Sequence, residues 1–200
     1  MSLQNLQKPS REFVTSYIEK FNSDERYYPA DVAINNLINQ YPQNNIFEDV
    51  LLKVTVINSL YSTFIRDVTG MSRHIVKLGI DSRLAKDDLS LVEDIATKHG
   101  IGRGKNGSRF FSFATKYCNW HRQNAYPIYD SYVEKILIAF RDTYHFSVFK
   151  NSELKDYYCL KRVIDEFIEK YSLTEFNMKA IDKFLWRYGK EIFPPKNKQA

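Results

Sequence analysis

An amine and a carboxylate occur close together near the middle of the chain, in the segment Ser108–Phe140. Lys116 lies within the first of two expected helices, and Asp130 lies at the start of the second. An amine can act as a nucleophile, and a fixed carboxylate can stabilise positive charge or activate an attacking group. Both residues also have ordinary explanations, as a solvated lysine and as a helix N-cap. They are therefore candidate catalytic residues whose roles the sequence leaves open.

Two helices joined by a short loop must position these residues. Helical spacing of three and four places one apolar stripe on the first helix, made of Phe110, Phe113, Ala114, Tyr117 and His121. The opposite side carries a polar ridge of Arg109, Ser112, Lys116 and Asn119. We therefore expect Lys116 to project from this ridge and Asp130 to cap the second helix.

Helical spacing and capping residues recur along the whole chain, and no segment has the alternation typical of strands. We predict an all-α fold: a single globular domain over residues 1–200, with about eight or nine helices. Residues 1–9 and 194–200 are expected to be flexible tails. The helices expected before the central pair cover Ser10–Phe21 (capped by Ser10), Pro29–Tyr41, Ile46–Val68 (ended by Gly70), Ser72–Leu78 (ended by Gly79) and a segment from its cap at Asp87 or Asp88 to His99.

The positive charge of the chain is concentrated in one window, Ile95–Tyr129, which contains no Asp or Glu. Its six cations are Lys98, Arg103, Lys105, Arg109, Lys116 and Arg122. The rest of the chain holds the other 23 basic residues and all 24 acidic ones, a net charge of −1. Such a basic window is typical of proteins that bind polyanions, and a solvated basic loop is the alternative. Its Gly-rich segment 100–107 could hold a phosphate through backbone N–H groups.

Composition excludes several classes of protein. Two cysteines, Cys118 and Cys159, form no disulfide framework and cannot ligate an iron–sulfur cluster. The Cys118-x-x-His121 spacing lacks a second pair of ligands, so we expect no zinc site and no other metal or cofactor. No apolar run reaches the ~18–20 residues that span a bilayer, and the N-terminus lacks a signal-peptide pattern. We expect a cytoplasmic protein with no membrane partner.

The segment Ala125–Val133, with the helix before it, resembles the helix-hairpin-helix DNA glycosylase superfamily, particularly its 8-oxoguanine DNA glycosylase-like branch. In that superfamily a helix is followed by a short loop, a Pro-x-x-Asp or similar turn, and a helix of V-x-x-[IVL]-L type. The resemblance covers residues 46–140 and implies that Asp130 is the catalytic aspartate. It also implies that the helix ending at Ile65–Met71 lends a polar side chain to the DNA, which we assign to Asn58.

The sequence departs from the family pattern at the lysine. Bifunctional members of the superfamily carry a nucleophilic lysine directly after a Gly-h-Gly hairpin. Alignment without gaps from Asp130 places that lysine position at Ser112, one turn before Lys116. Alignment on Gly100–Gly102 places it near Lys105 instead. Catalysis through a lysine Schiff base and chemistry through the aspartate alone therefore both stay open.

The resemblance implies a DNA glycosylase-like enzyme that flips an oxidised purine of the 8-oxoguanine type out of duplex DNA and excises it, with or without lyase activity. The alternative is a catalytically silent nucleic-acid-binding module of the same fold. In both cases the partner is DNA, with a damaged base in the case of the enzyme, and we expect a monomer. The residues expected to contact DNA are Arg103, Lys105, Arg109, Ser112, Asn119 and Asn58.

Overall fold

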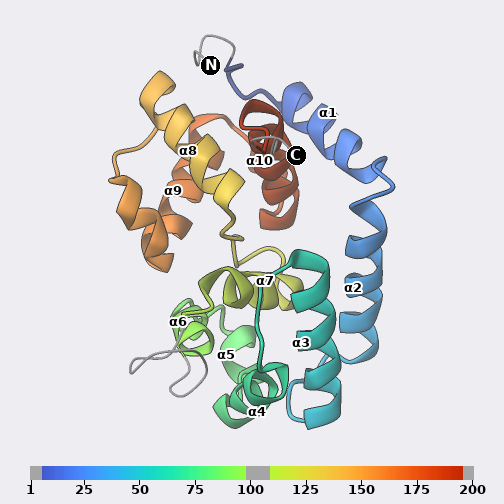
Figure 1. The fold of residues 1–200 in the computed structure, drawn as a ribbon. Coiled ribbons are helices and arrows are strands. Elements are labelled where there is room, and N and C mark those ends of the chain that lie inside the picture. The colour runs from blue at the N-terminus through green and yellow to red at the C-terminus, as the bar shows by residue number, and fades with distance from the viewer. Residues whose placement is uncertain (1–5, 98–108, 196–200) are drawn as a thin grey trace. The chain divides into compact units, whose positions relative to one another are not determined.

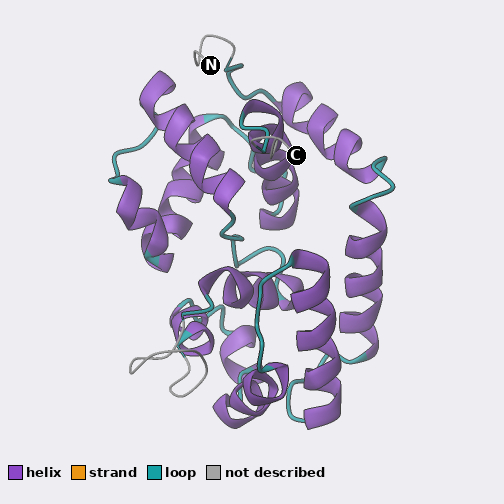
Figure 2. Cartoon of the chain, in the orientation of Figure 1, coloured by secondary structure: helices purple, strands orange, loops and turns teal. Residues whose placement is uncertain are grey.

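The computed structural model describes residues 6–97 and 109–195 of the chain. Within these residues there are ten α-helices and one 3-10 helix, and no strand beyond an isolated bridge between Thr97 and Arg109 (Figure 2). The all-α prediction is confirmed. The chain divides into two compact units: unit 1 contains Met1–Asp24 and Tyr129–Ala200, and unit 2 contains Glu25–Ile128 (Figure 1). Since two such units can be parts of one domain, the prediction of a single domain stays a prediction.

Unit 2 contains six helices: α2 (Tyr28–Gln40), α3 (Phe47–Tyr61), α4 (Val68–Leu78), α5 (Asp81–Ala85), α6 (Ser90–Ala96) and α7 (Phe111–His121). The helix at its centre is α7, which packs against α2, α3 and α6. Every side chain from Phe113 to Trp120 is buried. A helix surrounded on all sides in this way has no solvent face, so its polar residues must find partners inside the unit.

Unit 1 combines α1 (Arg11–Asn22) with four elements from the end of the chain: α8 (Ser131–Tyr144), the 3-10 helix η2 (Asn151–Lys155), α9 (Tyr157–Lys170) and α10 (Met178–Ile192). α10 packs against both α1 and α8. Aromatic rings fill the space among these helices, with centroids 4.9–6.5 Å apart, from Phe13, Tyr17, Phe140, Phe167, Phe184 and Tyr188. Rings in edge-on or offset contact at these distances supply a large part of the apolar core.

Capping residues mark where the helices of unit 1 begin. The Ser10 hydroxyl accepts a hydrogen bond from the Phe13 N–H at 3.2 Å, so the cap predicted for α1 is confirmed. The Asn177 side chain accepts from the Ala180 N–H at 2.8 Å and caps α10 in the same way. Each cap gives a partner to an N–H group that the helix itself leaves unpaired.

The helix expected from Ile46 to Val68 was predicted too long. α3 ends at Tyr61 because Ser62 takes a left-handed conformation with φ +49°. Gly70, which was expected to end this helix, lies instead in the first turn of α4. Its N–H donates to the Asp67 carboxylate at 2.7 Å, and Asp67 caps α4. The apolar spacing continues through the sequence, but the left-handed turn breaks the helix.

One helix was not expected, and two other helices begin at residues that differ from the expected ones. α5 was not expected, and α6 begins at Ser90 rather than directly after Asp88. The Asp88 carboxylate still accepts from the Ser90 N–H, at 3.0 Å, inside the turn that precedes α6. α4 begins four residues before the predicted start at Ser72, and it ends as predicted at Gly79, where φ is +60°.

Part of the expected N-terminal tail is packed against unit 1. Leu6 is buried, and its carbonyl oxygen accepts a hydrogen bond from the Tyr144 hydroxyl. The Gln7 N–H donates to the Tyr188 hydroxyl at 2.7 Å. The segment from residue 6 to residue 9 is therefore held by α8 and α10. Residues 194–195 of the expected C-terminal tail are exposed. The remainder of the expected tails, residues 1–5 and 196–200, lies outside the described residues.

Gly189 allows α10 to approach α8, because a Cβ atom there would lie 2.7 Å from the Tyr132 carbonyl oxygen and 3.3 Å from the Ile136 Cβ. We expect Gly189→Ala to lower the free energy of unfolding by about 1–3 kcal/mol, although alanine favours a helix by about 1 kcal/mol. Gly79→Ala is the comparison: it adds no clash but keeps φ at +60°, which should cost about 1–2 kcal/mol. Urea unfolding followed by circular dichroism measures both variants. A Gly189→Ala protein more stable than wild type would contradict the close approach.

Candidate functional site

The predicted nucleophile, Lys116, is buried in unit 2 rather than projecting from a solvated ridge. Its side chain is only 2% exposed. The Nζ atom donates to the Ser112 Oγ at 2.6 Å and lies 5.4 Å from the centre of the Tyr61 ring. The Tyr61 hydroxyl in turn donates to the Asp31 carboxylate at 3.1 Å. The structure thus brings Lys116 and Ser112 together, as the helical spacing predicts, and adds Tyr61 and Asp31, which sequence analysis missed.

Asn119, on the same helix, is fully buried as well. Its Nδ2 donates to the Tyr126 carbonyl oxygen at 2.6 Å. The Tyr126 hydroxyl donates to the Asp88 carbonyl oxygen at 3.1 Å. Asn119 therefore fixes the segment that follows α7. Lys116 and Asn119, which were expected on a solvated polar ridge, are instead buried and hydrogen-bonded inside unit 2. Ser112 is the one residue of the ridge within α7 that stays partly exposed.

Asp130, the predicted carboxylate, caps α8 as expected and belongs to unit 1. Its Oδ1 accepts a hydrogen bond from the Tyr132 N–H at 2.9 Å, and the side chain is half-exposed. The first turn of α8 is itself held by α10, through the close contact at Gly189 and an edge-on contact between the Tyr132 and Trp186 rings. Lys116 belongs to unit 2, so the two predicted catalytic residues are each held within a different unit.

The basic window contains fewer unpaired cations than its sequence suggests. Arg109 forms a bidentate ion pair with Glu93, with an NH2–Oε2 distance of 2.6 Å. Arg122 pairs with Asp87 at 2.9 Å. Both carboxylates belong to unit 2 but lie before the window in sequence. A count of the charges within the window therefore misses them. Arg103 and Lys105, with the Gly-rich segment, lie outside the described residues.

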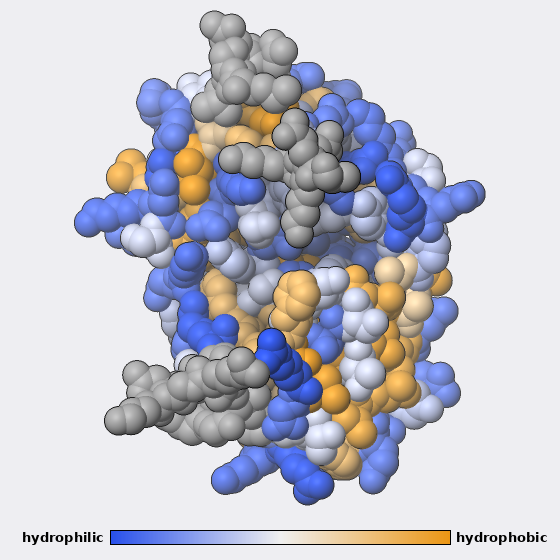
Figure 3. All heavy atoms as spheres, viewed as in Figure 1, coloured by the Kyte–Doolittle hydropathy of each residue, from blue (hydrophilic) through white to orange (hydrophobic). Residues whose placement is uncertain are grey.

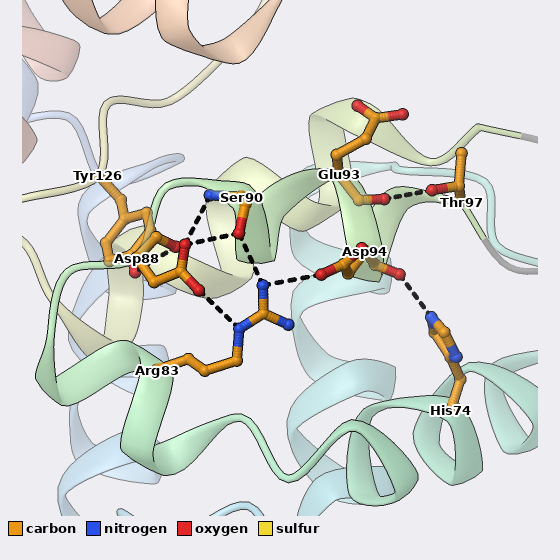
Figure 4. Close-up of polar contacts among 8 residues, drawn as sticks. All are labelled: His74, Arg83, Asp88, Ser90, Glu93, Asp94, Thr97 and Tyr126. Atoms are coloured by element: carbon orange, nitrogen blue, oxygen red, sulfur yellow. Dashed lines mark hydrogen bonds and ion pairs between the residues drawn. The ribbon is translucent and has the colours of Figure 1, made fainter.

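A polar network holds α6, the helix that leads into the basic window (Figure 4). The Arg83 guanidinium donates to the Asp88 carboxylate and to the Ser90 hydroxyl, and it pairs with Asp94 at 2.7 Å. Hydrogen bonds from Ser90 and Arg83 lower the pKa of Asp88, so this carboxylate keeps its charge. The His74 Nε2 lies 2.7 Å from the Asp94 carbonyl oxygen and so donates to it. These contacts link α4 and α5 to α6.

The two residues that flank the undescribed segment are paired with each other. Thr97 and Arg109 form the isolated antiparallel bridge, and the Phe110 N–H donates to the Ala96 carbonyl oxygen at 2.8 Å. The Arg109 guanidinium also lies 4.1 Å from the centre of the Phe111 ring. The end of α6 and the residues just before α7 are therefore held side by side at Thr97 and Arg109.

Asn58, the residue expected to reach DNA, holds the turn after α3. Its Oδ1 accepts from the Thr63 hydroxyl at 2.8 Å and from the Ile65 N–H at 2.9 Å, and its Nδ2 donates to the Ile65 carbonyl oxygen. Between these anchors lies Phe64, which is 83% exposed and has φ +60°. A bulky residue in the left-handed region is rare and strained. The turn therefore presents an aromatic side chain to solvent on a fixed backbone.

Sequence analysis also missed a buried ammonium group, that of Lys53. The Nζ atom donates to the carbonyl oxygens of Tyr41 and Gln43 and to the Asn44 Oδ1, at 3.0, 2.7 and 2.7 Å. Burial lowers the pKa of Lys53 to about 8, against opposing attraction from Asp81 and Asp49. The signal was present in the sequence, because Lys53 lies between the core positions Val50, Val54 and Ile57 of α3.

Asn44 connects Lys53 to the rest of unit 2. Its Oδ1 also accepts from the Tyr117 hydroxyl on α7 at 2.6 Å, and its Nδ2 and backbone N–H donate to the Asp81 carboxylate on α5 at 2.7 and 2.9 Å. Burial raises the pKa of Tyr117 well above its usual value, so its proton stays in this hydrogen bond. Lys53, Asn44 and Tyr117, the buried members of this cluster, are hydrogen-bonded to one another or to neighbouring groups, which indicates a structural role.

Among the described residues, no partners complete a metal site with His121 and Cys118. Burial and the nearby Lys53 charge lower the pKa of His121 to about 3, so the ring is neutral, and its Nε2 is buried without a hydrogen-bond partner among the described residues. Cys118 is a buried free thiol. In the described ranges no group of three His, Cys, Asp or Glu side chains could hold a metal ion. The same ranges contain no helix long and apolar enough to cross a membrane.

Replacing the buried ammonium should destabilise unit 2. Lys53→Met keeps the length of the side chain but leaves the acceptors at Tyr41, Gln43 and Asn44 without their donor. We expect the free energy of unfolding to fall by about 3 kcal/mol or more. Lys86→Met, at an exposed position, should change it by less than about 0.5 kcal/mol. Equal urea midpoints for the two variants would show that the Lys53 hydrogen bonds contribute nothing.

The same group predicts how stability depends on pH. The pKa of Lys53 is about 8 in the folded protein and 10.5 for an ordinary lysine. Between these values the unfolded chain holds a proton that the folded chain has lost, so this group makes the free energy of unfolding rise with pH, by up to about 3 kcal/mol. Wild type minus Lys53→Met, measured by urea unfolding from about pH 7.5 to pH 10, isolates this rise. A flat difference would contradict the lowered pKa.

Comparison with known proteins places the chain in a family. A family model described as an N-terminal domain, HI_0787_N, matches residues 13–125. An uncharacterized protein of Haemophilus influenzae is 39% identical over 152 residues, which cover 76% of this chain and 71% of that protein. No solved structure matches the chain significantly. The family model matches more than half of the chain, and the alignment with this relative covers about three quarters of the chain. The chain therefore belongs to the HI_0787_N family.

Proposed function

We propose that the chain is a DNA N-glycosylase that removes an oxidised purine of the 8-oxoguanine type, with Asp130 as its catalytic carboxylate. The observation that carries the proposal is the way Asp130 is held: half-exposed at the start of α8, with Oδ1 fixed by the Tyr132 N–H. Because the first turn of α8 is packed against α10, the carboxylate keeps one orientation. Stabilisation of developing charge requires a group oriented in advance.

Such a site would act on a nucleotide flipped out of the duplex. The bond between the sugar C1′ and the base nitrogen breaks, and the base leaves with the electron pair. The Asp130 carboxylate stabilises the positive charge that develops on the sugar. A water molecule then forms the new bond to C1′ and gives one proton to Asp130, and Asp130 releases that proton to the base anion through solvent, so the carboxylate is regenerated. The products are the free base, protonated on nitrogen, and a sugar that carries a hydroxyl at C1′.

The environment of Lys116 favours this hydrolytic reaction over a lysine Schiff base. An amine that attacks a sugar must reach it, but the Lys116 side chain is 2% exposed and its Nζ is held by Ser112 and the Tyr61 ring. Of the two mechanisms that the sequence leaves open, chemistry through Asp130 alone therefore needs the smaller rearrangement. The burial of Lys116 also favours a second candidate function, a catalytically silent nucleic-acid-binding module.

DNA contact in this proposal runs through the basic window, at Arg103, Lys105 and Arg109, with the Ser112 hydroxyl nearby. Arg109 is a partial contributor because a phosphate must compete with the Glu93 carboxylate for its guanidinium. The prediction that Asn58 and Asn119 contact DNA has less support, because Asn58 bonds to backbone groups of the turn after α3 and the Asn119 Nδ2 bonds to the backbone after α7.

Asp130→Asn separates the catalytic role from the capping role. Asparagine caps helices about as well as aspartate, so the free energy of unfolding should change by less than about 1 kcal/mol. Base release from oligonucleotides that carry oxidised purines should fall by at least about 100-fold. Asp156→Asn, at the N-cap of α9 in the same unit, is the matched control and should keep activity. Equal activity in the two variants would remove Asp130 from the mechanism.

Borohydride trapping on the same oligonucleotides distinguishes the two chemistries. Under the hydrolytic mechanism no covalent protein–DNA adduct should form, because no Schiff base is present to be reduced. An adduct that is lost in Lys116→Gln would show that the buried amine reaches the sugar after all. An adduct lost in Lys105→Gln would place the nucleophile in the Gly-rich segment. If no lesion in the panel is excised while DNA is bound, the silent module is the better description.

The salt dependence of DNA binding locates the contact surface. Replacing Arg103, Lys105 and Arg109 by alanine should weaken binding and reduce the slope of log K against log salt by about 2, less than three full phosphate contacts because Arg109 is paired. A control variant with Lys150, Lys155 and Lys170 replaced, exposed cations of unit 1, should keep the wild-type slope. Fluorescence anisotropy with labelled duplex measures both. An unchanged slope in the first variant would move the contact elsewhere.

A further inference from the structure

The apolar side chains that unit 2 exposes gather on α2, α3 and the segments that flank α3. Figure 3 shows apolar atoms over these helices. Six of the eight large apolar side chains that are most exposed in the described residues belong to this group, so they form a surface rather than a scatter: Tyr28, Val32, Ile46, Leu52, Leu60 and Phe64. Contiguous apolar surface of this kind marks an interaction site. We call it the α3 surface.

The solvent side of α3 carries no charge beyond its first turn. Leu52 and Leu60 are 42% and 45% exposed, Val56 lies half-exposed between them, and Thr55 and Ser59 complete the face. The Thr55 hydroxyl already donates to the Leu51 carbonyl oxygen at 2.8 Å, so it could be covered without losing a hydrogen bond. The face is about 22 Å long for a helix of 15 residues.

Phe64 adds an exposed apolar ring just beyond the end of the helix. It is 83% exposed and has φ +60°, and hydrogen bonds of Asn58 hold Thr63 and Ile65 on either side of it. Exposing a large apolar ring on a strained backbone does not stabilise the isolated chain. Strain of this kind is typical of positions that contact a partner.

The charges at the two ends of α3 indicate which partner fits. Glu48, exposed in the first turn, precedes Leu52 by four residues. Arg66 is exposed just past the other end, while its neighbour Asp67 directs its carboxylate to the Gly70 N–H. A second copy of the same face, turned end to end, would place Glu48 opposite Arg66 twice, with the uncharged leucines between. A twofold axis produces this arrangement and requires a face without repelling charges at its centre.

We propose that the α3 surface is the interface of a homodimer, in which α3 of one copy lies antiparallel to α3 of the second copy. This proposal is independent of the DNA glycosylase function and replaces the monomer that we expected from the sequence. Leu52, Leu60 and Phe64 supply the buried apolar area, and the two Glu48–Arg66 pairs set the antiparallel direction.

Analytical ultracentrifugation of the full chain between about 1 and 100 µM tests the proposal. Wild type should sediment as a dimer at the upper end of this range. The double variant Leu52→Glu/Leu60→Glu should be monomeric with an unchanged circular dichroism spectrum, because both side chains are exposed. Val148→Glu is the control, since Val148 is a 90% exposed apolar residue of unit 1, and it should leave the dimer intact. A wild type that is monomeric throughout would overturn the proposal and leave the surface to a different partner. A dimer that survives the double variant would overturn the location.

Charge reversal tests the antiparallel direction. Glu48→Arg and Arg66→Glu should each weaken the dimer, by about twofold to tenfold, because each places like charges opposite one another. The combined variant Glu48→Arg/Arg66→Glu restores opposite charges and should recover wild-type affinity. In a parallel dimer each residue would face its own copy, so like charges would face each other in every variant and neither single reversal would change the affinity. Unchanged affinity in both single variants, or additive weakening in the combined variant, would therefore overturn the antiparallel arrangement.

Discussion

The buried Lys53 ammonium is the interaction on which unit 2 depends. It satisfies three acceptors at once, two of them carbonyl oxygens in the turn between α2 and α3 and the third the side chain of Asn44. Asn44 also forms hydrogen bonds with Asp81 on α5 and with Tyr117 on α7. Four segments that are distant in sequence therefore share one polar centre. An isolated buried charge would be costly. Here three acceptors offset part of that cost, although burial still disfavours the charged form and lowers the pKa of Lys53.

The same centre explains why α7 can be polar and buried together. Inside a core, Lys116, Asn119 and Tyr117 are tolerated because hydrogen bonds satisfy most of their polar atoms, although the Asn119 Oδ1 has no partner among the described residues. Ser112 and Tyr61 serve Lys116, and the loop that leaves α7 serves Asn119. Groups that look like a reactive ridge in the sequence are therefore members of the core. We therefore assign the proposed chemistry to Asp130, whose carboxylate is held by the Tyr132 N–H and is half-exposed.

Sequence reasoning succeeded where a local rule decides the outcome. The helical class, the Ser10 cap and the Asp130 cap follow from spacing and from side chains that act within one turn. It failed where a turn conformation or contacts beyond one helical turn decide. The end of α3 depends on a left-handed Ser62 and on the Asn58 hydrogen bonds, although the apolar spacing continues past it. Arg109 and Arg122 pair with Glu93 and Asp87, which lie before the basic window in sequence. A count of charges within the window therefore overstated its net positive charge.

The order of the segments along the chain has a consequence for synthesis. Unit 2 is continuous, but unit 1 needs both α1 and the elements from α8 onward. The apolar face of α1, with Val14, Tyr17 and Phe21, finds its partner in α10, near the other end of the chain. As the polypeptide emerges from the ribosome, α1 must wait while the whole of unit 2 is made, and unit 2 can bury its core first. A nascent chain arrested within α9 would therefore carry an exposed α1, a segment suited to chaperone binding.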